Sequence, residues 1–154
     1  MCIRDRAGTL KQMGIETVLV QEYAKELAYQ GLLEDPDQDD IVTNQMAREL
    51  IYCGTDIQVI ITDSPVRMAT VYGASRAVTD LHEHTMEING FKHVQVFVER
   101  TGDYNHIGRS QTEAEALEKD QEILGLMDRP DFESITKNTI AQYAQQIKRR
   151  YFDV

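Results

Sequence analysis

Residues 56–65 read DIQVIITDSP, a run of apolar and β-branched side chains that ends in an acidic residue, a serine and a proline. Three similar short runs lie at Ile15–Val20, His93–Val98 and, more weakly, Asp131–Thr136. Near-continuous Val and Ile runs are typical of strands that are buried on both faces of a parallel sheet. We therefore predict four parallel strands, with Asp56–Thr62 as the second.

The stretches between these runs have helical periodicity. Helices are predicted over about 38–53, over 66–88 with a break near 72–75, over 112–127 after the capping-type sequence TEAE, and over 140–151. On the first of these, one apolar stripe is formed by Val42, Met46, Leu50 and Cys53. Alternating strands and helices indicate βαβ units with right-handed crossovers. The predicted fold class is α/β, a three-layer parallel sheet flanked by helices.

The composition excludes several classes of protein. The 154 residues suit one domain, and 42% apolar with 27% charged residues is typical of a globular chain. Sixteen Lys and Arg against 26 Asp and Glu give a net charge of −10, which disfavours a nucleic-acid polymer as a partner but allows a small phosphorylated ligand with its magnesium. Two cysteines without zinc spacing, no long apolar run and no signal peptide predict a cytoplasmic protein without a membrane span.

The first residues differ in character from the rest. MCIRDR, residues 1–6, holds three charges in six positions and resembles translated sequencing-adapter sequence, so we predict a foreign or disordered leader over 1–6 and a single domain over 7–154. AGTLKQMG, residues 7–14, is typical of the end of a helix with Gly14 as the C-cap. A domain that opens on the end of a helix is predicted to be truncated. The alternative is a flexible natural N-terminus on a complete small domain.

The residues that follow the strands are candidates for a binding site, because ligands of open parallel sheets bind at the carboxyl ends of the strands. Glu22, Tyr23 and Lys25 follow the first predicted strand, and Asp63 and Arg67 follow the second. Asp63 after Val59–Thr62 has the pattern of a Walker B strand, whose carboxylate holds Mg²⁺. An Asp before Ser-Pro is equally typical of a helix cap.

Residues 100–112 have the composition of a lid. Arg100 and Arg109 carry planar guanidinium groups suited to phosphate oxygens, and Tyr104 lies between two glycines of the same stretch. An ordinary surface loop whose arginines pair with surplus carboxylates is the alternative. None of the nine glycines is followed by lysine, so the GxxxxGK phosphate loop is absent from the sequence. His82 and His84 are two residues apart and share no helix face, so we predict no histidine metal site.

Three segments together resemble a known family. They are VQEYAKELAYQG at 20–31, DDIVTNQMARELIYCGTDIQVIITDSPVRMATVYG at 39–73, and FKHVQVFVERTGDYNHIGRSQTEAEALEKD at 91–120. They resemble the P-loop ATPase and kinase family related to NadR-type nicotinamide-nucleoside kinases, especially small phage-borne members of the AAA or nucleotide-kinase kind. The resemblance extends from about Ala7 to the last predicted helix.

This resemblance implies a fold of the P-loop NTPase and nucleotide-kinase type that lacks its first, central strand and its phosphate loop. A strand, loop and helix of ordinary length amount to roughly 25 residues. The family's sheet order, 2-3-1-4-5, places the absent strand between Asp56–Thr62 and His93–Val98. These two are therefore expected to leave a gap, to pair directly, or to be bridged by the leader.

The resemblance also implies a function, with ATP and Mg²⁺ as cofactors. The implied activity is transfer of the ATP γ-phosphoryl group to a nucleoside or nucleotide. Asp63 corresponds to the magnesium-binding and catalytic acid, Arg100 and Arg109 to the lid arginines beside Tyr104, and Glu22 to the acid that faces the acceptor.

Tyr23, Lys25 and Arg67 are the further candidates for substrate binding. Without a phosphate loop, the given chain is expected to be impaired in ATP binding. The alternatives are an ATPase or nucleotide-dependent switch acting on a protein partner, and a polynucleotide 5′-kinase.

Overall fold

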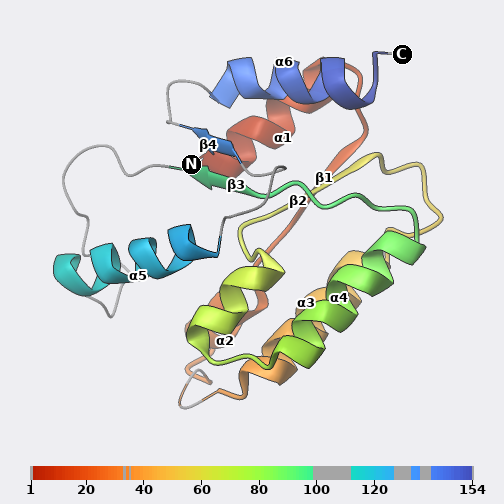
Figure 1. Cartoon of the computed structure of the whole chain (residues 1–154). Coiled ribbons are helices and arrows are strands. Elements are labelled where there is room, and N and C mark those ends of the chain that lie inside the picture. The colour runs from red at the N-terminus through yellow and green to blue at the C-terminus, as the bar shows by residue number, and fades with distance from the viewer. Residues whose placement is uncertain are drawn as a thin grey trace.

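The computed structural model describes residues 2–32, 34, 36–98, 112–126, 133–135 and 140–153. In chain order its elements are α1 (Cys2–Gln12), β1 (Thr17–Val20), α2 (Tyr23–Tyr29), α3 (Gln38–Leu50), β2 (Val59–Thr62), the 3-10 helix η1 (Val66–Tyr72), α4 (Arg76–Ile88), β3 (Val96–Val98), α5 (Glu113–Gly125), β4 (Glu133–Ile135) and α6 (Ile140–Tyr151) (Figure 1). The predicted alternation of strands and helices is confirmed, and the fold is mixed α/β.

The strands form two separate parallel pairs. β1 pairs with β2 in a register that sets Thr17 opposite Val59 and Val20 opposite Thr62. β3 pairs with β4 in the same parallel sense. No ladder joins the two pairs within the described ranges, so the expected single sheet is replaced by two small sheets. Of the three arrangements expected for β2 and β3, the described residues show the gap.

The strands are shorter than the sequence predicts. β1 begins at Thr17 rather than Ile15, and β2 begins at Val59 rather than Asp56. The backbone carbonyl of Glu16 accepts hydrogen bonds from the N–H groups of both Gln58 and Val59, at 2.8 and 3.1 Å. The Gln58 side chain in turn accepts one from the Glu16 N–H, at 3.0 Å. These contacts replace the regular ladder at the start of the pair.

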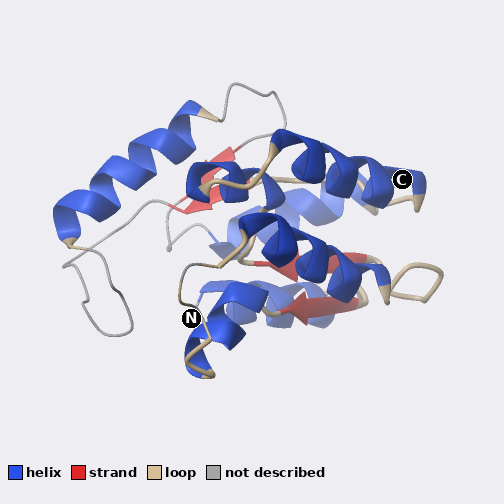
Figure 2. Cartoon of the chain, turned by 90° about the horizontal axis from the view of Figure 1, so that it is seen from below, coloured by secondary structure: helices blue, strands red, loops and turns tan. Residues whose placement is uncertain are grey.

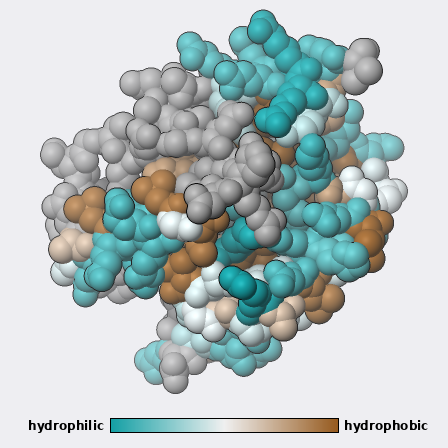
Figure 3. Space-filling model, in the orientation of Figure 1, coloured by the Kyte–Doolittle hydropathy of each residue, from teal (hydrophilic) through white to brown (hydrophobic). Residues whose placement is uncertain are grey.

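Helices lie on both faces of the β1–β2 pair (Figures 1 and 2). On one face α1 and α6 pack together, with Leu10, Ile15 and Ala144 buried against partly buried side chains of β2. On the other face α3, η1 and α4 form a second apolar cluster around Val42 and Val66. Figure 3 shows the surface of the molecule from the same side as Figure 1. The described residues on this side are mostly hydrophilic, and the hydrophobic ones lie in separate patches.

Several helix ends agree with the sequence. Gly73, with φ of 101°, ends η1 before α4 starts, which confirms the predicted break. Thr112 and Glu115 form a capping box at the start of α5. Gly14 follows α1 with φ of 79°, as expected for a glycine just after a helix. α1 itself begins at Cys2, so the residues expected to form a leader are helical from that point and continue α1.

Candidate functional site

Two acidic side chains follow β1 and β2 at their carboxyl ends, and the charge of one acts on the other. Because Val20 lies opposite Thr62, the residues that follow each strand emerge at the same edge of the pair. Burial raises the pKa of Glu22 above its usual 4.5, and the negative charge of Asp63 raises it further, while Lys25 opposes the shift. The strand-end prediction therefore brings Glu22, Asp63 and Lys25 into one electrostatic group.

An adjacent pair of carboxylates can share a proton or bind a divalent cation. Mg²⁺ is commonly held by one or two carboxylates, with water and phosphate oxygens completing its shell. Across the part of the chain that the structure describes, no group of three or more His, Cys, Asp or Glu side chains could hold a metal ion. Glu22 and Asp63 therefore fit a partial oxygen shell and not an all-protein cage.

Tyr23, predicted to bind substrate, is used in packing. Its N–H donates to Gln45 Oε1 at 3.0 Å at the start of α2. Its ring lies under the guanidinium of Arg48, 4.7 Å from the ring centroid. Arg48 also forms an ion pair with Glu26 at 2.6 Å. These contacts hold α2 against α3 and so fix the backbone beside Glu22.

Arg67, also predicted to bind substrate, is engaged within the protein. Its Nε and Nη2 both donate to the carboxylate of Glu83, which joins η1 to α4. This bidentate ion pair uses the two parallel N–H donors of the guanidinium that an anionic ligand would need. The predicted lid residues Arg100, Tyr104 and Arg109 lie outside the described residues.

A chain of buried polar side chains, not predicted from the sequence, connects three elements of the fold. Gln45, Glu49 and His82 are 2%, 4% and 2% exposed. Gln45 Nε2 donates to Glu49 Oε1 at 3.0 Å and to Thr62 Oγ1 at 3.2 Å. His82 Nε2 lies 2.9 Å from Glu49 Oε2. This polar chain, Gln45–Glu49–His82, connects α3 to α4 and to the end of β2.

The buried face of α3 differs from the predicted stripe for the same reason. Its buried residues are Ile41, Val42, Gln45 and Glu49, whereas Met46 and Leu50 are only partly buried. The available signal was the i, i+4 spacing of Gln45 and Glu49, which places two polar groups on one face.

Gln45 also holds the two acidic residues in relation to one another. Its side-chain oxygen accepts from the N–H of Tyr23, the residue after Glu22. Its side-chain nitrogen donates to Thr62, the residue before Asp63. A single buried amide thus joins the chain neighbours of both acids across the strand pair.

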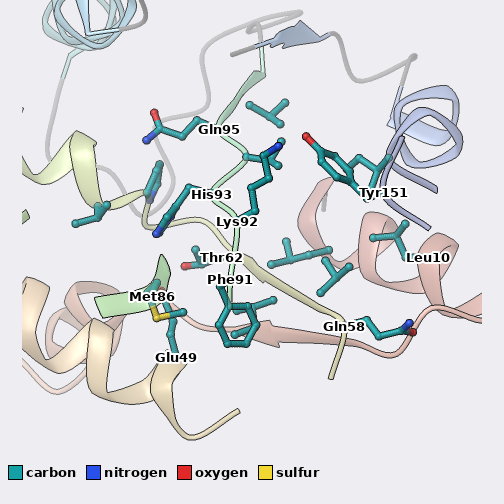
Figure 4. Close-up of a pocket in the computed structure, with 18 of the residues that line it drawn as sticks. Leu10, Glu49, Gln58, Thr62, Met86, Phe91, Lys92, His93, Gln95 and Tyr151 are labelled. Atoms are coloured by element: carbon teal, nitrogen blue, oxygen red, sulfur yellow. The ribbon is translucent and has the colours of Figure 1, made fainter. Parts of the chain in front are cut away.

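A cavity of about 370 Å³ lies along β2 (Figure 4). It is lined by residues 58–62 along β2, by residues 90–96 on the way into β3, and by side chains of α1, α4 and α6. The buried side-chain atoms without a hydrogen-bond partner in the described structure are His82 Nδ1, His93 Nε2 and the Tyr151 hydroxyl. All three residues line this cavity.

Among the described segments, no helix is both long and apolar enough to cross a bilayer. Comparison of the chain with protein-family models, with curated proteins and with solved structures found no match in any of the three.

Proposed function

We propose that the carboxyl edge of β1 and β2 is the cation and acceptor side of a phosphoryl-transfer site. In this proposal the protein is a small-molecule kinase of the P-loop nucleotide-kinase type, which moves the ATP γ-phosphoryl group to a nucleoside or nucleotide. The observation that carries it is the register that sets Val20 opposite Thr62, so that Glu22 and Asp63 follow the two strands at one edge, where burial and the charge of Asp63 raise the pKa of Glu22.

The two acids are suited to different tasks. Asp63 is the residue we assign to Mg²⁺, which when bound neutralises phosphate charge. Glu22 is assigned to the acceptor, because a carboxyl group with a raised pKa is better matched to proton transfer near neutral pH. The acceptor oxygen forms a bond to the γ-phosphorus, the bond from that phosphorus to the bridging oxygen breaks, and the acceptor proton passes to Glu22.

Phosphate contacts are assigned to Arg100 and Arg109, with Tyr104 beside the nucleotide. The chain has no glycine followed by lysine, so these arginines are its candidates for neutralising the phosphates. A nucleic-acid acceptor is disfavoured by the net charge of −10.

The test starts with the cation. Mg²⁺ is titrated into protein labelled with ¹³C at the Asp and Glu carboxyl groups, and the signals of Glu22 and Asp63 are followed. We expect saturable shifts of both, at least tenfold weaker binding in Asp63→Asn, and no change in the matched control Asp56→Asn, an exposed acid that precedes β2. Equal binding in Asp63→Asn and the unchanged protein would refute the assignment.

Transfer is measured next, with γ-labelled ATP, Mg²⁺ and a panel of nucleosides and nucleotides. A labelled acceptor that disappears with Asp63→Asn supports the kinase. Labelled inorganic phosphate without any labelled acceptor would overturn the kinase in favour of an ATPase, and a labelled oligonucleotide in favour of a polynucleotide 5′-kinase.

A further inference from the structure

The cavity beside β2 separates the two strand pairs. Five consecutive residues, 58–62, line it from one strand pair, and seven, 90–96, line it on the way into the other pair. Figure 4 shows His93 and Gln95 on the segment entering β3, and Thr62 and Gln58 at the two ends of the β2 wall. We name this cavity the strand slot.

β2 and β3 each have one backbone edge that has no strand beside it in the described chain. β2 pairs through one edge with β1, and β3 pairs through one edge with β4. In a parallel ladder the N–H and C=O groups point alternately to the two sides, so one pairing leaves half of them unused. The slot is therefore lined by β2, which has an unpaired edge, and by the segment that leads into β3, which also has one.

The segment entering β3 is consistent with a strand that lacks a neighbour. The sequence predicts a strand from His93, yet regular pairing starts only at Val96, and residues 91–95 have no regular secondary structure. A strand needs partners to form its ladder, so a missing neighbour shortens it.

The remaining walls are formed by helices on both faces. Leu10, Ala144 and Ile147 of α1 and α6 supply an apolar wall on one face. Met86, Glu49 and His82 line the opposite face. A strand enclosed in this way is buried on both sides and requires a nearly continuous apolar sequence.

Buried polar atoms in the slot lack the partner that a backbone could supply. His82 is 2% exposed, its Nε2 is bound to Glu49, and its Nδ1 has no hydrogen-bond partner. His93 Nε2 and the Tyr151 hydroxyl are in the same condition. Leaving such a group unpaired in a buried position is unfavourable, so a ligand that offers N–H and C=O groups is favoured over a purely apolar one.

We propose that the strand slot binds an extended peptide segment of about five or six residues, which pairs with β2 and β3 and joins the two pairs into one sheet. The segment is apolar and β-branched where it lies between the helices. Basic residues at its ends suit a chain with a net charge of −10. The proposal is independent of phosphoryl transfer, because it rests on the opposite edge of β2 from β1.

The probe is a synthetic peptide, acetyl-Lys-Val-Ile-Val-Val-Ile-Lys-amide. Two control peptides have the same sequence but carry N-methyl groups at positions 2, 4 and 6, or at positions 3 and 5. In a strand, alternate N–H groups point to opposite edges, so each control removes the donors toward one edge. Binding is measured by calorimetry, stoichiometry by sedimentation, and amide protection by hydrogen exchange.

We expect one-to-one binding, at least tenfold weaker binding of both N-methylated peptides, and new protection at residues 58–62 and 93–98. Absence of binding, equal binding of either N-methylated peptide, or protection elsewhere would each overturn the proposal. Ile60→Trp places an indole in the slot and should abolish binding, whereas Leu81→Trp, at an exposed site on α4, should not. If Ile60→Trp fails to fold, the two N-methylated peptides still test backbone pairing in the unchanged protein.

Discussion

Replacing Glu49 with alanine should destabilise the protein more than any loss of a surface ion pair. Glu49 is 4% exposed, and its two oxygens engage Gln45 and His82 at 3.0 and 2.9 Å. Gln45 keeps its bond to Thr62 in the variant, but His82 is left with neither ring nitrogen paired. A buried nitrogen left without a partner costs about 1–3 kcal/mol, and the one lost methylene adds about 0.8 kcal/mol.

The expected loss is therefore about 2–4 kcal/mol of the free energy of unfolding, a large part of the roughly 5–15 kcal/mol by which a domain of this kind is stable. Urea unfolding followed by circular dichroism measures it, with the slope m as the check that the unfolded state is unchanged. Glu49→Gln, which preserves the shape and can still hydrogen-bond both neighbours, should recover much of the loss.

The matched control is Glu26→Ala. Glu26 pairs with Arg48 at 2.6 Å, but the two side chains are 45% and 30% exposed, so the expected loss is about 0.2–1 kcal/mol. If Glu49→Ala lowered the free energy of unfolding no more than Glu26→Ala does, the polar chain would contribute no more to stability than an exposed ion pair, and the reasoning would be refuted.

Three further outcomes are expected. Burial and the charge of Asp63 raise the pKa of Glu22 above its usual 4.5. Between these two pKa values the folded protein keeps a proton that the unfolded chain has released, so the free energy of unfolding falls as the pH rises from 4.5 through the pKa of the folded state. Glu22→Gln should remove that fall, so a stability difference from the unchanged protein that is the same at about pH 4 and pH 7 would contradict it. Ser75→Ala should cost about 0.5–2 kcal/mol in urea unfolding, because the Ser75 hydroxyl caps α4 by accepting from the Val78 N–H at 3.3 Å; an unchanged midpoint would count against it. Calorimetry with Mg·ATP should give a Kd weaker than about 10 μM, since the chain has no GxxxxGK loop, and a low-micromolar value would contradict this.

Features set by nearby residues were predictable from the sequence. The capping box of Thr112 and Glu115, the break ended by Gly73 and the glycine after α1 all depend on residues within a few positions of one another. The meeting of Glu22 and Asp63 was predictable for a different reason, because parallel strands bring their carboxyl ends to one edge whatever their length.

Features that depend on distant partners were not predictable. His82 was judged only against His84, although its partner Glu49 lies 33 residues away on another helix. The strand from His93 was predicted from its residue types, but it starts at Val96, because a strand requires a neighbour that no local pattern specifies. Arg67 was predicted to bind substrate from its place after β2, and no local pattern indicates its partner Glu83 on α4.

The acid pair and the strand slot are joined by the polar chain. Gln45 contacts the backbone beside Glu22 and the side chain beside Asp63, and the chain continues through Glu49 to His82, whose free Nδ1 belongs to the slot lining. A carboxylate oxygen only accepts, so the contact with Glu49 already places a proton on Nε2, and Nδ1 is the ring nitrogen that can accept an N–H from a bound strand. Peptide binding should therefore keep this tautomer, shift the ¹⁵N resonance of Nδ1, and restrict Gln45 in the same step. Unchanged His82 shifts in a saturated complex would show that the strand pairs with β2 and β3 without contacting the polar chain. The acid pair and the strand slot would then lie next to each other without being coupled.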